Sequence, residues 1–319
     1  MSISRLLVAN RGEIAIRIMR SAGELGIDTD AIYSEDDADS LHTQKADAAT
    51  QLTGRGASAY LDIEQIIEVA KGNRCDAIHP GYGFLSENPD FARKCAGAGI
   101  NLVGPGLEAL ELFGDKAKAR SFASRLGVPV LEGTVKATTK AEARFFMASL
   151  DEGAQVMIKA ISGGGGRGIR VVTNPDELDE AFSRCQSEAK SAFGSTQVYV
   201  EEYLPRSRHI EVQIVGDGNS VMHMGERDCS VQRRHQKILE LAPAPGVDAG
   251  LLEQIHKAAT DLAGSVNYRG LGTFEFLLAA DMSRFAFIEA NPRLQVEHTV
   301  TEEVTGHDLV AVQLRLADG

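Results

Sequence analysis

Residues 287–299 read Phe-Ile-Glu-Ala-Asn-Pro-Arg-Leu-Gln-Val-Glu-His-Thr and change from an apolar strand to a polar loop. Side chains two residues apart on a strand lie on the same face, so several polar groups can project together. These polar residues are Glu289, Asn291, Arg293, Gln295, Glu297 and His298. Pro292 ends regular pairing because it has no N–H to donate to the sheet. Carboxylates, an amide and a fixed cation this close together predict a hard cation with phosphate oxygens and a neighbouring acid–base group.

The size and composition indicate a globular protein with more than one core. At 319 residues the chain exceeds the usual size of a single core, so we expect two or three subdomains. Hydrophobic residues make up 43% and charged residues 24%, which is ordinary for a globular protein. The net charge of -12 argues against a nucleic-acid-binding surface, which needs a basic patch. Any phosphate site must therefore be a local positive pocket in an acidic protein.

The N-terminus and the cysteines bear on the compartment. The apolar run within residues 1–11 is too short for a signal peptide or a membrane span. We therefore expect no membrane association and a cytoplasmic location, or an organelle matrix if a targeting segment was removed. The cysteines contain no C-x-x-C pair, and we expect reduced, mostly buried thiols, although four cysteines are enough to form two disulfides. They are Cys75, Cys95, Cys185 and Cys229.

Strands and helices alternate in the first third of the chain. The apolar runs predict buried strands at 6–9, 31–33, 77–78 and 101–103. A helix with apolar residues at helical spacing follows the first strand and is ended by Gly26, and a second helix is expected at 62–70. This alternation predicts a parallel sheet covered by helices. The first strand–helix turn lacks the G-x-G-x-x-G fingerprint, which disfavours an NAD-binding domain.

The remaining two thirds predict a helix, a small α/β unit and a region dominated by strands. The helix, rich in Lys, Arg and Ala, is expected at 115–127. The small unit has predicted strands at 156–160, 169–172 and 197–202, and a helix from 175 into the 180s. The last region has predicted strands at 209–215, 221–224, 272–278 and 285–290, and helices near 250–266 and 306–317.

A glycine-rich loop, Ser-Gly-Gly-Gly-Gly-Arg-Gly at 162–168, joins two strands of the small unit. Successive glycines let backbone N–H groups approach an anion closely, and the arginine adds positive charge. The strand that follows excludes a Rossmann loop, which must open a helix, and Ile169 and Arg170 stand where a Walker A loop needs Lys and Ser/Thr. A glycine hairpin that closes over a triphosphate is favoured over an ordinary surface hairpin.

Three charged side chains on predicted secondary structure are candidate ligands. Lys159 ends the strand before the glycine loop, and an amine there could reach phosphates that the loop covers. Taken alone, Lys159 is more typical of a solvated edge lysine, and Lys116 is a similarly weak candidate. Glu275 lies in a strand of otherwise apolar residues, where an ionised carboxylate needs a compensating cation or donor. The alternative is an outward-facing glutamate, but with Glu289 and Asn291 on a neighbouring strand a divalent metal is favoured.

Two further segments are candidate anion or ligand sites. Residues 227–237, Arg-Asp-Cys-Ser-Val-Gln-Arg-Arg-His-Gln-Lys, are strongly basic, and an anion site is preferred over a solvated charge run. Gln232 and His235 in this segment are candidates for cofactor contacts. Residues 79–88, His-Pro-Gly-Tyr-Gly-Phe-Leu-Ser-Glu-Asn, follow a strand where ligands bind in open α/β sheets. A bare turn is an equally good interpretation of this second segment.

These segments, in this order, resemble the biotin carboxylase family of the ATP-grasp superfamily, and the resemblance spans the whole chain. The matching stretches are 9–15, 79–88, 114–116, the glycine loop, 208–213, 226–237 and 289–298. The resemblance implies an α/β ATP-grasp fold with a Rossmann-like parallel N-terminal domain, a small α/β lid and an antiparallel α+β C-terminal domain. The expected boundaries are 1–113, a helical linker at 114–131, the lid at 132–203 and the C-terminal subdomain at 204–319.

Carried over by position, the resemblance also implies roles for individual residues. The expected ligands of the ATP phosphates are Lys116, Lys159, His209, Gly163, Gly164, Gly165, Gly166 and Gly168. Glu201 and Leu204 would meet the adenine, and Tyr82 would lie near the biotin ring. The expected ligands of Mg²⁺ or Mn²⁺ are Glu275, Glu289 and Asn291. Bicarbonate would be surrounded by Lys237, Arg293, Gln295 and Val296, with Glu297 as its general base.

The implied reaction transfers bicarbonate carbon to biotin at the expense of ATP. Bicarbonate attacks the γ-phosphate to give carboxyphosphate and ADP, and the released carbon dioxide adds to N1′ of biotin. A bound metal and Arg293 would offset the charge repulsion, and a closed lid would keep water from the intermediate. The implied partners are a biotin carboxyl carrier and a carboxyltransferase, which selects the final acceptor. The family also forms homodimers.

One departure from the family pattern raises alternatives. The sequence ends at Gly319, in what resembles the middle of the family's C-terminal domain, and no Ala-Met-Lys-Met-type biotinyl motif is present. We therefore expect a truncated C-terminal domain that lacks the family's dimerisation surface, which puts the homodimer in doubt. We expect the biotin carrier on another segment or chain. The alternatives are a nucleotide-binding fragment that cannot catalyse turnover, and another bicarbonate-using ATP-grasp ligase such as a carbamoyl-phosphate-type enzyme.

Overall fold

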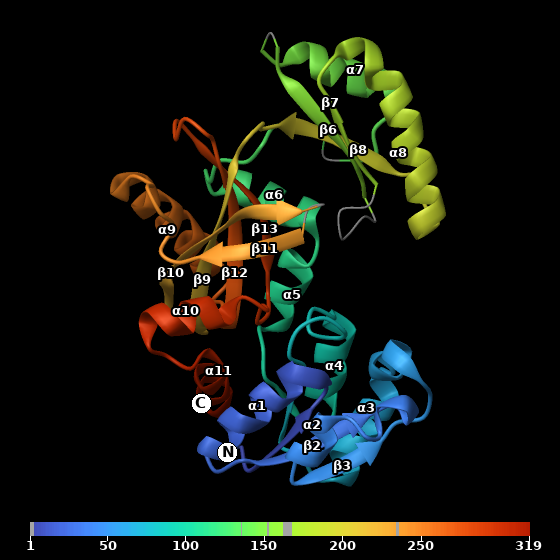
Figure 1. Ribbon diagram of the computed structural model, residues 1–319, viewed down its shortest axis with the longest axis vertical. Helices are drawn as coiled ribbons and strands as arrows, with labels where there is room; N and C mark the ends of the chain where they lie inside the picture. The colour runs from blue at the N-terminus through green and yellow to red at the C-terminus, as the bar shows by residue number, and fades with distance from the viewer. Residues whose placement is uncertain (1–2, 135, 152, 162–167, 234–235) are drawn as a thin grey trace.

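Three β-sheets lie one above another along the long axis of the molecule (Figure 1). The computed structural model describes residues 3–134, 136–151, 153–161, 168–233 and 236–319. In Figure 1 the N-terminal sheet lies at the bottom, a five-stranded antiparallel sheet in the middle, and a three-stranded sheet at the top. No helix among the described residues combines the length and the hydropathy needed to cross a membrane. The four cysteines are buried and have free thiols.

The N-terminal sheet is parallel and has the strand order β3-β2-β1-β4-β5, as the alternating pattern predicts. Its strands are β1 Arg5–Val8, β2 Asp28–Tyr33, β3 Ala48–Gln51, β4 Ala77–His79 and β5 Asn101–Leu102. The helices are α1 Gly12–Glu24, α2 Leu41–Lys45, α3 Ile63–Gly72, α4 Pro89–Gly97 and α5 Leu107–Phe113. Two separate hydrophobic clusters cover the two faces of the sheet, which is why its strands are apolar without alternation.

The three-stranded sheet, with order β7-β6-β8, forms a small lid that is packed on one face by helices. Its strands are β6 Gln155–Ala160, β7 Ile169–Val172 and β8 Val198–Tyr203. Helix α7, Lys140–Ser149, begins with a capping box between Thr139 and Glu142, and α8 spans Leu178–Phe193. Strands β6 and β7 pair antiparallel on either side of the glycine loop, so the predicted hairpin strands are confirmed. The loop residues 162–167 lie outside the described residues.

The central sheet is antiparallel and has the order β11-β10-β9-β12-β13. Its strands are β9 Arg208–Asp217, β10 Val221–Arg233, β11 Gln236–Leu241, β12 Arg269–Leu278 and β13 Phe285–Asn291. Helices α6 Lys116–Arg125 and α9 Ala249–Gly264 pack on its apolar face. Helix α10, His298–Thr305, contacts β10, and α11, Leu309–Asp318, packs between β12 and α1.

Along the paired strands β9 and β12 of the central sheet, residues alternate between its two faces. Ile210, Val212 and Phe274 point into the core beneath α6 and α9 and are 0% exposed. Their neighbours in sequence, Glu211 and Glu275, point to the opposite face, where the other polar groups gather. The register of the sheet therefore supports the polar face expected at Glu275, and ligand binding by that face stays a prediction.

Two predicted elements in the last third were wrong in extent. The strand predicted at 221–224 continues to Arg233, so the described residues of the basic segment 227–237 belong to the paired strands β10 and β11. The helix predicted at 306–317 begins only at Leu309, and a separate helix, α10, precedes it. Gly306 ends α10 with a φ of 71°, a left-handed conformation that favours glycine and breaks the helix at that point.

Candidate functional site

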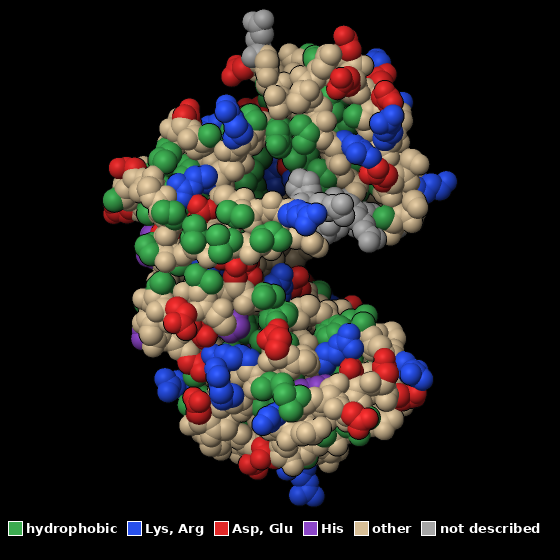
Figure 2. Space-filling view, in the orientation of Figure 1, with side chains coloured by type: hydrophobic (Ala, Val, Ile, Leu, Met, Phe, Trp, Pro, Cys, Tyr) green, Lys and Arg blue, Asp and Glu red, His purple; other side chains and the backbone are tan. Residues whose placement is uncertain are grey.

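A cavity of about 1090 Å³ lies between the lid and the central sheet. Figure 2 shows the surface hollowed between the lid at the top and the body beneath it. The cavity is lined by α6, by lid strands β6 and β8, and by the middle of β13. Residues 130–134 also line the cavity, and within them Val130 pairs with Phe287 of the body and Gly133 pairs with Glu201 of the lid. A single short segment therefore links both walls.

Cations from the body and the lid meet two carboxylates inside this cavity. Lys159 of β6 contacts the carboxylate of Glu201, which is 4% exposed. Arg120 of α6 donates to Glu201 Oε2 at 2.7 Å and to the carbonyl of Leu131 at 2.6 Å. On the body side, Lys116 contacts Glu289 of β13. Burial lowers the pKa of Lys116, but the attraction of Glu289 outweighs this effect, so the pKa is raised. A polyanion entering this cavity would meet three fixed cations.

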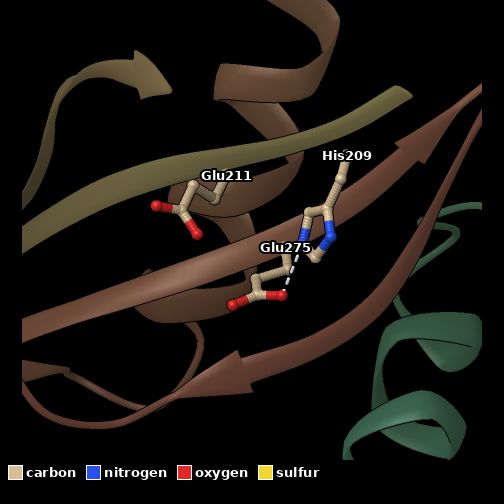
Figure 3. Close-up of side chains that lie close together, drawn as sticks. All are labelled: His209, Glu211 and Glu275. Atoms are coloured by element: carbon tan, nitrogen blue, oxygen red, sulfur yellow. Dashed lines mark hydrogen bonds and ion pairs between the residues drawn. The ribbon is translucent and has the colours of Figure 1, made fainter. Parts of the chain in front are cut away.

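A second cluster of charges lies on the polar face of the central sheet (Figure 3). Glu211 of β9 and Glu275 of β12 are directly paired positions of the antiparallel register. His209 Nε2 donates to Glu275 Oε2 at 2.6 Å. One ligand atom from each of His209, Glu211 and Glu275 lies within 4.8 Å of the others, and among the described residues a second such group is formed by Glu211, Cys229 and Glu297.

Lys237 joins these carboxylates from the edge strand β11. Its ammonium contacts Glu211 and Glu297, and lies 3.3 Å from Glu275 Oε1. Burial opposes a charge on Lys237, but the attraction of Glu275 and Glu211 outweighs it and raises the pKa. Burial also opposes a charge on Glu297 and so raises its pKa. The attraction of Lys237 outweighs this effect, and the pKa of Glu297 is lowered. Both groups are therefore ionised at neutral pH, in an arrangement that can hold an anion next to a base.

The loop after β13 supplies the remaining polar groups. Asn291 Nδ2 and Gln295 Nε2 donate to Glu275 Oε1 at 2.6 Å and 3.2 Å. Arg293 Nη2 donates to Asn291 Oδ1 at 3.2 Å. Arg293 also meets the N-terminal domain, because its Nε lies 3.0 Å from Glu87 Oε1. The prediction that alternate residues of this stretch act together is supported by these contacts.

The donor set fits a hard divalent cation. Glu275 and Glu289 are paired positions of β12 and β13, and Asn291 follows on the same strand. The pKa of Glu275 is raised by burial but lowered more strongly by His209 and Lys237, so this carboxylate is ionised. Two carboxylates and an amide oxygen are hard ligands of the kind that Mg²⁺ uses together with substrate phosphates. Lys116 and Lys237 supply the neutralising positive charge to these carboxylates in the structure.

The structure does not bring every predicted residue to these two clusters. Leu204 follows β8 and is absent from the described lining of the cavity. Val296 is 63% exposed. Gln232, by contrast, does reach the second cluster, because its Nε2 lies 2.9 Å from His209 Nδ1. Tyr82 is half-buried beside the N-terminal core, and its carbonyl accepts from Asn10 Nδ2 at 2.8 Å. The predictions for Gly163, Gly164, Gly165, Gly166 and His235 lie outside the described residues, whereas Gly168 immediately precedes the return strand β7 and has a φ of 67°.

Four charged residues of the site were missed by the sequence analysis. They are Glu87, Arg120, Glu211 and Arg227. The alternation of polar and apolar residues along 209–214 places Glu211 on the same face as His209, so period-two reasoning could have found it. Arg120 lies one helical turn after Lys116 on α6, at a spacing that places both on one face. Glu87 and Arg227 lie in the candidate segments 79–88 and 227–237, but no local pattern singles out either residue, because their partners lie far away in sequence.

Two family models match consecutive parts of the chain. The model for the N-terminal domain of biotin carboxylase matches residues 2–110, and the model for the ATP binding domain of the carbamoyl-phosphate synthase L chain matches residues 115–319. The biotin carboxylase–beta-gamma-ATP complex from Campylobacter jejuni has a TM-score of 0.94 and 43% sequence identity. That match covers 99% of this chain and 71% of the Campylobacter jejuni chain. The chain belongs to the biotin carboxylase family.

Other biotin carboxylase structures and longer relatives are also similar. The biotin carboxylase domain dimer of 2-oxoglutarate carboxylase from Hydrogenobacter thermophilus, in complex with MgADP, ADP and bicarbonate, has a TM-score of 0.92 and 41% identity. That match covers 100% of this chain and 70% of the other. Pyruvate carboxylase from Bacillus subtilis is 53% identical over 100% of this chain and 28% of its own length. The chain thus spans little more than a quarter of the curated relatives it matches, and the predicted ATP-grasp fold is confirmed.

Proposed function

We propose that this chain carries out the ATP-dependent carboxylation of biotin with bicarbonate, through carboxyphosphate. The observation that carries the proposal is the position of Lys237, which joins three carboxylates on the sheet that also forms the wall of the cavity. An acidic protein that gathers fixed cations around a small polar site can bind a small anion next to a larger one. Bicarbonate and the triphosphate of ATP are such a pair.

Lys237 and Arg293 are the proposed anchors of bicarbonate, together with Gln295 and the backbone at Val296. Lys237 and Arg293 carry positive charge, and their side chains are 20% and 22% exposed. Glu297 contacts Lys237 and is ionised, so it can accept the proton of bicarbonate. The freed oxygen attacks the γ-phosphorus, the bond to the β-phosphate oxygen breaks, and ADP leaves.

The nucleotide is proposed to occupy the cavity between lid and body. Lys116, Lys159 and His209 would meet its phosphates together with Gly163–Gly168, and Glu201 and Leu204 would meet the adenine. The lid side contributes Lys159 and the body side contributes Lys116, so binding would draw the two walls together. Water excluded from the closed cavity could not hydrolyse carboxyphosphate.

The proposed metal ligands are Glu275, Glu289 and Asn291, which offer oxygen donors from paired strands. When bound there, Mg²⁺ or Mn²⁺ would neutralise charge on the phosphates of ATP. Lys116 and Lys237 would then be released from the carboxylates toward the two anionic substrates. The division of the chain into segments 1–113, 114–131, 132–203 and 204–319 remains part of this proposal.

The proposed partners are a biotin carboxyl carrier and a carboxyltransferase, and Tyr82 is the proposed neighbour of the biotin ring. The support is that similar proteins include pyruvate carboxylases and a single-chain, multi-domain long-chain acyl-CoA carboxylase. A homodimer is proposed because the similar Hydrogenobacter thermophilus domain is a dimer. The acidic charge supports the proposal that nucleic acid is not a partner, and a cytoplasmic or organelle-matrix location is proposed with it.

The test is ADP release from MgATP by the full chain, with bicarbonate and free biotin each present or omitted. The expected result is release that requires bicarbonate and rises with biotin. Glu297→Gln should remove the bicarbonate-dependent part, whereas Glu303→Gln, an exposed change on helix α10, which Glu297 immediately precedes, should leave it intact. Ammonia-dependent release would instead indicate a carbamoyl-phosphate-type ligase. MgATP binding without any release would contradict the proposed activity.

A further inference from the structure

Arg227 is a fully buried arginine beneath the polar face of the central sheet. Its side chain is 0% exposed, and it is the largest of the fully buried side chains described. The residue lies on β10, next to β9, and points away from the apolar core toward the polar cluster. The sequence analysis includes Arg227 in the candidate anion segment 227–237 but gives this residue no role of its own.

Every N–H group of the Arg227 guanidinium has an acceptor. Nε donates to Glu211 Oε1 at 2.5 Å. Nη1 donates to Gln213 Oε1 at 3.1 Å and to Thr301 Oγ1 at 2.7 Å. Nη2 donates to Thr273 Oγ1 at 3.4 Å and to Gln295 Oε1 at 3.2 Å. A guanidinium has five N–H donors in a fixed planar fork, so these acceptors use its whole capacity.

The acceptors come from four different elements, namely β9, β12, the loop after β13 and helix α10. A charge buried this completely is costly unless it is paired and fully hydrogen-bonded, so the arrangement is highly constrained. A surface salt bridge would tolerate alternative side-chain positions, but this one does not. Arg227 therefore fixes the relative positions of the elements that it joins.

Two of the acceptors are themselves connected to the proposed bicarbonate anchors. Glu211 contacts Arg227 through Oε1 and Lys237 through Oε2, so it is held between two cations. Gln295 accepts from Arg227 through Oε1 and donates to Glu275 through Nε2. Both chains of contacts therefore begin at Arg227 and end at the charged groups around Lys237.

We infer that Arg227 is a positioning residue for the bicarbonate site: it fixes Glu211 and Gln295 from below and so sets where the Lys237 ammonium lies. The inference rests on the proposed function, which places bicarbonate at Lys237. Arg227 does not belong to the described lining of the nucleotide cavity, so we expect its replacement to affect bicarbonate more than MgATP. It acts through its neighbours and does not touch the reacting atoms.

Lysine is the informative replacement because it keeps the charge but loses the fork. An ammonium has three donors that spread from one point, and it cannot span acceptors on four elements. Arg227→Lys should still offset the charge of Glu211, while Gln295 and Thr301 lose their donor. A purely electrostatic role would be rescued by this substitution, and a positioning role would not.

The test compares KM values for bicarbonate and MgATP in Arg227→Lys, using bicarbonate-dependent ADP release by the full chain. We expect KM for bicarbonate to rise by about 10- to 100-fold, the usual effect of losing a residue that orients direct ligands. KM for MgATP should change by less than about threefold. Arg120→Lys is the matched control, because Arg120 makes a comparable fork inside the nucleotide cavity and should raise KM for MgATP instead.

Equal changes in both KM values, or none, would overturn the inference. A crystal structure of Arg227→Lys provides a readout that does not depend on activity. Displacement of Gln295 and of the Lys237 ammonium supports the inference, and unchanged positions of both refute it. If the unsubstituted chain shows no bicarbonate-dependent ADP release, the proposed function fails, and the crystal structure still decides the positioning role of Arg227.

Discussion

Arg293 Nε lies 3.0 Å from Glu87 Oε1, so a residue of the loop after β13 is held by the N-terminal domain. Glu87 belongs to the segment 79–88, which contains Tyr82, and Arg293 belongs to the loop that carries Gln295 and Glu297. The proposed biotin-side and bicarbonate-side segments are therefore connected by an ion pair between domains. The two segments lie some 200 residues apart in the chain, at 79–88 and 289–298.

Removing the charge of Glu87 should have a smaller effect than removing Arg293. The Glu87 side chain is 40% exposed, and partly exposed ion pairs contribute only about 0–1 kcal/mol, so Glu87→Gln should reduce bicarbonate-dependent ADP release by about fivefold or less. Arg293→Gln removes a cation from the anion site and should reduce release by about 100-fold or more. Steady-state kinetics with both variants checks the ranking, and equal losses would contradict it.

Glu289→Gln should weaken the dependence on divalent metal. The substitution removes one of two carboxylates at the proposed metal site, and loss of a ligand or its partner typically costs about 10–100-fold in metal affinity. We expect the Mg²⁺ concentration for half-maximal ADP release to rise by that factor, whereas binding of metal-free ATP should not weaken, because the substitution releases Lys116 from its ion pair with Glu289. Titration of activity with Mg²⁺ and of binding with ATP plus EDTA measures both. An unchanged metal requirement would refute the assignment of Glu289.

His79 should make the stability of the fold depend on pH. Its side chain is 0% exposed, and burial lowers the pKa of His79 to about 3. The unfolded chain binds a proton below pH about 6.5 that the folded protein excludes, so the free energy of unfolding decreases as pH falls through about 6.5 toward 3. For one group the decrease between pH 7.5 and pH 5.0 is about 2 kcal/mol.

Urea unfolding of His79→Gln at these two pH values checks the prediction. The variant is expected to be less stable than the parent at pH 7.5, because the N–H of Gly81 loses its acceptor, the Nδ1 atom 3.0 Å away. Its further loss at pH 5.0 should be about 2 kcal/mol smaller than that of the parent. His307→Gln, at an exposed position, serves as the control. Equal pH dependence in parent and His79→Gln would exclude His79 as the cause.

Two glycines should respond to alanine in opposite directions. A Cβ atom at Gly216 of β9 would lie 2.0 Å from the backbone oxygen of Tyr268, and backbone cannot move aside at low cost. Gly216→Ala should therefore destabilise the fold by about 3 kcal/mol or more. Gly23 lies on helix α1 with open space around its Cβ position, so Gly23→Ala should stabilise by about 0.5–1 kcal/mol. Thermal unfolding of both variants measures the difference in sign.

Local periodicity predicted the elements whose burial follows a simple rule. The apolar runs of the N-terminal sheet were found because that sheet is covered on both faces. The alternation around Glu275 was found because β12 has one core face and one polar face. The pairing of Glu275 with Glu289 on neighbouring strands was also expected and is present in the register.

Elements whose formation depends on tertiary context were missed. Helix α10 is rich in Thr and Val, whose branched side chains have low helix propensity, and it is stabilised by packing against β10. Strand β11 has mostly exposed residues and begins within the basic segment 227–237, which resembled an anion-binding segment rather than a sheet edge. The site residue Arg227 could not be predicted because its partners come from four elements that only the folded chain brings together.

Side chains alternate between the two faces along β9 and β12, so the strand register decides whether the polar site forms. Glu211 and Glu275 face the polar side only because Ile210, Val212, Phe274 and Phe276 face the core. A shift of one residue along either strand would bury a carboxylate in the hydrophobic core and expose apolar side chains to water. A form with shifted register is expected to be inactive, because the shift removes both the anion site and the burial of apolar side chains that drives folding. Selection for a stable central sheet therefore also preserves the geometry of the proposed carboxylating centre.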